Sequence, residues 1–67
     1  MKVIDINGKE RELSSIKRIK HDIADKDGNT IKTDYVEVMI VGRTRTWQEW
    51  WPLKDFMDKN KGFDQWS

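Results

Sequence analysis

The sequence lacks cysteine, and it contains only one histidine and one proline. Without cysteine it can form neither a disulfide nor a thiolate zinc site, and His21 alone does not make a histidine-based metal cluster. A chain of 67 residues forms at most one domain, and domains this small often need such cross-links. We therefore expect a single domain over residues 1–67, without metal or cofactor, whose core is filled mainly by aromatic rings.

Long apolar runs are also missing. The longest is Met39-Ile40-Val41, far shorter than the roughly 20 residues that span a membrane. Asp5 interrupts the first apolar residues, so a typical signal peptide is not expected. The absence of cysteine fits a reducing compartment. These features predict a cytoplasmic protein with no membrane partner.

Neither sign of charge is in excess, with 13 basic and 12 acidic residues. A surface that binds phosphates normally shows a clear basic excess, so a nucleic-acid partner is the less favoured one. No phosphate-binding glycine loop and no Gly-x-Ser-x-Gly motif occurs in the sequence. Most carboxylates lie among lysine and arginine, as on a solvated surface. We expect no catalytic residues and no enzymatic activity.

The N-terminal residues predict a hairpin. Val3–Ile6 is rich in β-branched residues, which favour strands. Asn7-Gly8 is typical of a type I′ turn, in which both central residues have φ > 0. The returning segment, Lys9–Glu12, is fully charged, so we expect it to be an exposed edge or a loop. This pairing would place Asp5 opposite Glu10.

Leu13–Ala24 permits two interpretations. Ile16, Ile19 and Ile23 have the spacing of a helix face, whereas Ile19 and Ile23 also alternate with charged residues as in a strand. Three β-branched isoleucines favour the strand. A tight turn over Asp25–Asn29 would follow.

The next segments predict two more strands and a helix. Thr30–Val41 has apolar residues on both faces, which is typical of a central strand. Gly42-Arg43 turns the chain into a second strand over Thr44–Trp51. Pro52 suits the first position of a short helix, and Gly62 lies where that helix would stop.

These elements predict a mainly β, α+β fold. Three to four antiparallel strands would form a curled meander, an SH3-like or OB-like half-barrel, with one short C-terminal helix. A flat sheet with helices on one face is the alternative. Residues 62–67, which include Phe63 and Trp66, would form a tail that is either flexible or folded back on the core.

The segment around residues 43–51 is the candidate contact surface. Strand alternation places Trp47 and Trp51 on one face, where they would fill the core, and turns Trp50 to the other face. An exposed Trp50 with Arg43 and Arg45 beside it has the composition of a binding hot spot. We expect a protein partner or self-association. The alternative is single-stranded nucleic acid stacked on the same surface.

The stretch Tyr35–Arg43, followed by Trp47, Trp50–Leu53 and Phe56, resembles small uncharacterised proteins of phages and prophages from Gram-positive bacteria. The resemblance covers residues 31–60 and assigns no functional residue. It implies an accessory role in a phage cycle, such as binding a host or virion protein or joining an assembly in the host cytoplasm.

Overall fold

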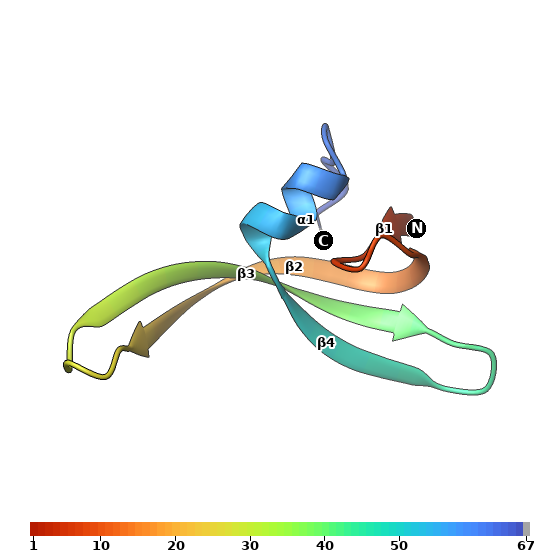
Figure 1. Ribbon diagram of the computed structural model, residues 1–67. Helices are drawn as coiled ribbons and strands as arrows, with labels where there is room; N and C mark the ends of the chain where they lie inside the picture. Colours follow the sequence, from red (N-terminus) through yellow and green to blue (C-terminus); the bar gives the residue numbers. More distant parts are fainter. Residues whose placement is uncertain (67) are drawn as a thin grey trace.

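Four consecutive antiparallel strands form one curled sheet, and a short helix stands over one of its faces (Figure 1). The computed structural model describes residues 1–66. The elements are β1 (Lys2–Ile4), β2 (Glu10–Ala24), β3 (Thr30–Val41), β4 (Thr46–Pro52) and α1 (Leu53–Lys59). The strands lie in the sheet in chain order, β1-β2-β3-β4. The predicted half-barrel meander with one C-terminal helix is confirmed.

The core lies between the sheet and α1, and it follows from alternation along the strands. Val36, Val38 and Ile40 of β3 point to this side and are buried, as are Trp51 of β4 and Phe56 of α1. We call the face of the sheet under α1 the inner face and the opposite one the outer face. Truncating a buried Phe or Trp to Ala typically costs about 3–5 kcal/mol, so these two rings dominate the stability of so small a core.

A β-bulge at Ser14 interrupts the alternation at the start of β2, whereas the ambiguous spacing of Ile16, Ile19 and Ile23 arises because Ile16 faces the core and the other two face outward. Leu13 pairs with Ile40 and Ser15 with Met39, so one extra residue sits between them in β2. The extra residue shifts the alternation and lets both Leu13 and Ile16 face the core. The strand prediction for this segment is confirmed.

Two turns of the same build connect β1 to β2 and β2 to β3. The Oδ1 atoms of Asp5 and Asp25 each accept hydrogen bonds from backbone N–H groups two and four residues later, at 2.8–2.9 Å. The fourth residue of each turn is a glycine with positive φ, +83° at Gly8 and +82° at Gly28. The expected type I′ turn is wrong, because within residues 1–66 only glycines have positive φ and that turn requires it at Asn7 as well.

The first turn buries its aspartate, although no pattern in the sequence predicts this. Asp5 is 4% exposed, and its Oδ2 accepts a 2.8 Å hydrogen bond from Nε of Arg11. Burial alone raises the pKa of Asp5, but the hydrogen bonds from Arg11 and two backbone N–H groups, with the Arg11 charge, hold it below its ordinary value. Glu10 pairs with Ile4 and not with Asp5, so the expected carboxylate conflict does not occur.

The helix and the residues after it close the core. The prediction that Pro52 takes the first helical position is off by one residue: Pro52 is the last residue of β4 and the N-cap of α1, with φ −57° and ψ 131°, and the helix begins at Leu53. Phe56 points into the core. Phe63 and Trp66 fold back onto Phe56, with ring centroids 5.0 and 6.0 Å away. The guanidinium of Arg18 lies 5.5 Å from the Trp66 ring. The tail is therefore folded back over its described part, residues 62–66, and residue 67 lies outside the described residues.

Candidate interaction surface on the outer face of the sheet

The outer face of the sheet has no helix over it in Figure 1. Because Val36 and Val38 point to the inner face, the residues beside them in β3 point outward, and the strand register extends this to β2 and β4. Over β2 from Ser15 on, β3 and β4, this face carries Ser15, Lys17, Ile19, His21 and Ile23 of β2, Ile31, Thr33, Tyr35, Glu37, Met39 and Val41 of β3, and Thr46, Gln48 and Trp50 of β4. At the β1 end, the same side of the sheet carries the charged residues Lys2, Glu10 and Glu12, because Val3 and Leu13 point inward. Below, the outer face means the first set of residues.

Three aromatic rings meet on this face, one from each of three strands. The His21 ring centroid lies 6.2 Å from that of Tyr35 and 5.6 Å from that of Trp50, both edge to face. Tyr35 and Trp50 are 6.2 Å apart and tilted. The three residues follow a diagonal across the strands, a spacing that long aromatic side chains can bridge. We call His21, Tyr35 and Trp50 the ring cluster.

The outer face also carries most of the exposed apolar surface. Of the five exposed large hydrophobic side chains among residues 1–66, only Ile6, in the first turn, lies elsewhere. Trp50 is 47% exposed and Ile31 is 49% exposed; Ile23 and Val41 are the other two. These four residues extend along the face, from Ile23 and Ile31 near the tip of the β2–β3 hairpin to Val41 at the other end of β3, and an apolar surface concentrated on one face is typical of an interaction site.

Charge is nearly absent from the outer face, although 37% of the residues in the chain are charged. Between Ser15 and the end of β4, its only members of the Asp, Glu, Lys and Arg group are Lys17 and Glu37; the other charged residues on this side of the sheet, Lys2, Glu10 and Glu12, lie at the β1 end. These two are cross-strand partners, with Nζ and Oε1 3.4 Å apart, so they neutralise each other. The core of a protein interface is typically poor in charge and rich in aromatic residues.

The far part of the β2–β3 hairpin extends past α1 in Figure 1. In this part, charged residues lie on the inner side, where the rest of the sheet carries its apolar core. This inner side carries Arg18, Lys20 and Asp22 of β2 and Lys32 and Asp34 of β3. Lys20 pairs with Asp34 and Asp22 with Lys32. Opposite charges across the strands suit a solvated face. The apolar residues of this hairpin therefore lie on the side that the chain itself leaves open.

The structure separates the three residues predicted to form a contact surface. Trp50 lies in the ring cluster on the outer face. Arg45 precedes β4 and stacks over Trp47, 5.5 Å from its ring, while Arg43 is exposed in the turn between β3 and β4. At about 3.3 Å per residue, the five steps from Arg45 to Trp50 span roughly 17 Å. The arginines and Trp50 do not form one contiguous group.

Trp47 and Trp51 are fixed on the inner face by the glutamate between them. Glu49 accepts hydrogen bonds from both indole N–H groups, Oε2 from Trp47 at 2.6 Å and Oε1 from Trp51 at 2.9 Å. Trp51 is 2% exposed and Trp47 packs at the margin of the core. The predicted division is confirmed, with these two rings turned inward and Trp50 turned outward.

His21, Tyr35, Ile23 and Ile31 were missing from the predicted surface. A signal for them was present, because the alternation that was noted at Ile19, His21 and Ile23 already places these residues on one strand face. What the sequence did not reveal is the register between β2 and β3, which sets Tyr35 beside His21.

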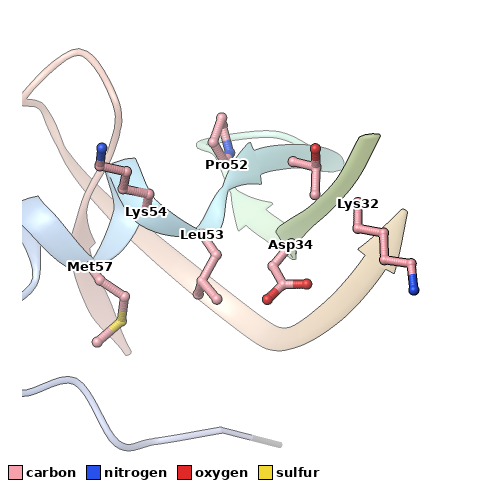
Figure 2. A pocket seen from close by; sticks show the side chains of 7 residues that line it. Lys32, Asp34, Pro52, Leu53, Lys54 and Met57 are labelled. Atoms are coloured by element: carbon pink, nitrogen blue, oxygen red, sulfur yellow. The ribbon is translucent and has the colours of Figure 1, made fainter. Parts of the chain in front are cut away.

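A shallow pocket of about 450 Å³ opens where the far hairpin meets the start of α1 (Figure 2). It is lined by Lys32, Thr33, Asp34, Pro52, Leu53, Lys54 and Met57. Leu53 and Met57 give it an apolar side. The side chains of Lys32 and Lys54 extend away from each other in Figure 2, so they do not converge as the polar groups of a ligand site do.

Within residues 1–66, no helix is long and apolar enough to cross a membrane. No three acidic or histidine side chains of the same residues gather closely enough to hold a metal ion. Scans of this chain against protein-family models, curated proteins and solved structures found no match.

Proposed function

We propose that this chain is a non-catalytic protein-binding module whose contact surface is the outer face of the sheet, centred on the ring cluster. One observation carries the proposal: the outer face is uncovered, it holds a half-exposed Trp50, and its only charged residues are the paired Lys17 and Glu37. Tryptophan at the centre of a water-excluding patch contributes most of the binding energy in many interfaces.

The chemistry of the face indicates the kind of partner. The outer face offers apolar and aromatic groups with Thr, Ser and Gln between them, and its single ion pair is already satisfied. A partner that covers it would therefore present an uncharged, largely apolar surface with a few hydrogen-bonding groups. In keeping with the resemblance of residues 31–60 to phage and prophage proteins, we propose that this partner is a virion or host protein.

Single-stranded nucleic acid is the alternative occupant of the same face. The rings of the cluster could stack on bases, but the only cation on the face, Lys17, is paired with Glu37. Affinity for nucleic acid comes largely from phosphate neutralisation. Arg43 and Arg45 lie at the far end of β4 from Trp50. The charge distribution thus favours a protein.

Matched lysine substitutions test the proposal. Ile31→Lys places a charge on the outer face, and Ile6→Lys makes the same change at a site of similar exposure, 41% against 49%, outside that face. A partner captured by the tagged wild-type chain is purified and titrated with each variant. We expect Ile31→Lys and Trp50→Lys to weaken binding by at least about tenfold, and Ile6→Lys to leave it unchanged.

Equal loss with Ile6→Lys, or none with Ile31→Lys, would contradict the proposal. Unfolding of Ile31→Lys would contradict it as well, since the outer face would then be needed for the fold. A parallel titration with random single-stranded oligonucleotides tests the alternative. Binding that falls steeply with salt and is lost with Trp50→Lys would favour nucleic acid.

A further inference from the structure

The outer edge of β4 has unpaired backbone groups. β4 is the last strand of the sheet, and within residues 1–66 only β3 pairs with it. Gly42 N–H donates to the Arg45 carbonyl at 2.8 Å, which makes these two a hydrogen-bonded pair. Such pairs alternate along an antiparallel ladder. The N–H and C=O groups of Thr46, Gln48 and Trp50 therefore point away from β3, toward the free edge.

The two edges of the sheet differ in whether their outward backbone groups have a hydrogen-bond partner. At the β1 edge, the Asn60 side chain takes the place of a neighbouring strand: its Oδ1 accepts from Ile4 N–H and its Nδ2 donates to the Ile4 carbonyl, both at 2.7 Å. Lysine, arginine, proline and bulges are usual devices that stop an edge from pairing with another chain, and residues 46–51 of β4 contain none of them. The proline of this strand, Pro52, lies at its very end, and its one charged residue, Glu49, points to the inner face, where it accepts from Trp47 and Trp51.

We infer that two copies of this chain pair through their β4 edges, antiparallel, around a two-fold axis at Gln48. An antiparallel strand matches a second copy of itself, which is the requirement for a two-fold interface. Each chain carries a formal net charge of only +1, so little long-range repulsion opposes the pairing.

Two observations favour this register over the one centred on Glu49. With Gln48 opposite the partner's Gln48, Thr46 lies opposite the partner's Trp50. Every outward N–H and C=O group of these three residues then has a hydrogen-bond partner in the other copy. Glu49 then lies opposite the partner's Trp47 on the inner face. Centring the pairing on Glu49 instead would set two carboxylates directly opposite, which is unfavourable, and would use Pro52, which has no N–H.

This pairing would join the two sheets into one and place the outer faces of both copies side by side. The paired copies would thus present two ring clusters on one continuous surface. The inference stands on the β4 edge alone and does not require that the outer face has a partner.

Charge substitutions at Gln48 test the pairing, with Gln65, an exposed residue of the tail, as the matched control. Sedimentation equilibrium of the full chain from about 10 μM to 1 mM covers the affinities of weak dimers. We expect the wild type to form dimers in this range. Gln48→Lys and Gln48→Glu each place like charges face to face and should raise the dissociation constant by at least about tenfold. An equimolar mixture of the two variants should restore dimers.

The same changes at Gln65 should leave the dimer as in the wild type, and Ile31→Lys should also leave it unchanged, which separates this test from that of the outer face. A wild-type chain that stays monomeric throughout would overturn the inference. So would a Gln48→Lys variant that still forms dimers like the wild type, or a mixture that stays monomeric. Circular dichroism of each variant confirms that it is folded.

Discussion

Among the polar residues outside the core, Asn60 is the one whose substitution is expected to lower the free energy of unfolding most. Its amide makes three hydrogen bonds, two with Ile4 and one from Nδ2 to the Phe56 carbonyl at 2.9 Å. It therefore ties the end of α1 to β1, across 56 residues of sequence. Asn60→Ala removes all three. At a net 0.5–1.5 kcal/mol each, and with water replacing part of the loss at this half-buried site, we expect a cost of about 2 kcal/mol.

That cost is large for this chain, whose total stability should be roughly 3–10 kcal/mol at its length. Thermal unfolding followed by circular dichroism should show a Tm lowered by about 8–16 °C. Lys61→Ala, an exposed neighbour, serves as the control and should shift the Tm very little. If Asn60→Ala changed the free energy of unfolding by less than about 0.5 kcal/mol, the assignment of Asn60 as the cap of the β1 edge would be refuted.

Two further substitutions probe the buried aspartate and the last turn. The folded-state pKa of Asp5 is lowered, so the stability that its ionised form contributes is present above the ordinary pKa of about 3.9 and is lost as the pH falls through the lower folded value. Asp5→Asn should therefore destabilise at pH 6, and its deficit relative to the wild type should shrink toward pH 2 in urea titrations; a constant deficit would contradict this. Gly42→Ala would place Cβ 2.6 Å from Cζ3 of Trp47 and 3.0 Å from the Arg45 carbonyl oxygen. It should cost about 1–3 kcal/mol, and an unchanged urea midpoint would show that the turn is looser than described.

Local patterns in the sequence were sufficient to predict the order and type of the elements. Alternation at Trp47, Trp50 and Trp51 predicted which ring faces the core, and Pro52 marked the start of the helix, because both signals act between residues close in the chain. The bulge at Ser14 was not predictable in this way, since it is defined by which residues of β3 stand opposite β2.

The residues of the candidate surface were likewise not predictable without the register between strands. The sequence placed Trp50 outside but grouped it with Arg43 and Arg45, its neighbours along the chain. The structure instead sets it beside His21 and Tyr35, which are brought near by the register of three strands. Strand spacing alone would have indicated that five residues separate Arg45 and Trp50 by roughly 17 Å.

The most direct test of the central claim is fluorine NMR of the chain labelled with 5-fluorotryptophan, each signal being assigned by a Trp→Phe variant. With a soluble gadolinium chelate, the Trp50 signal should broaden most and the Trp51 signal least, following their exposures of 47% and 2%. On addition of the captured protein partner, Trp50 should become protected while Trp51 stays unchanged. Equal broadening of all four signals, or a Trp50 signal that remains accessible in the complex, would contradict the account.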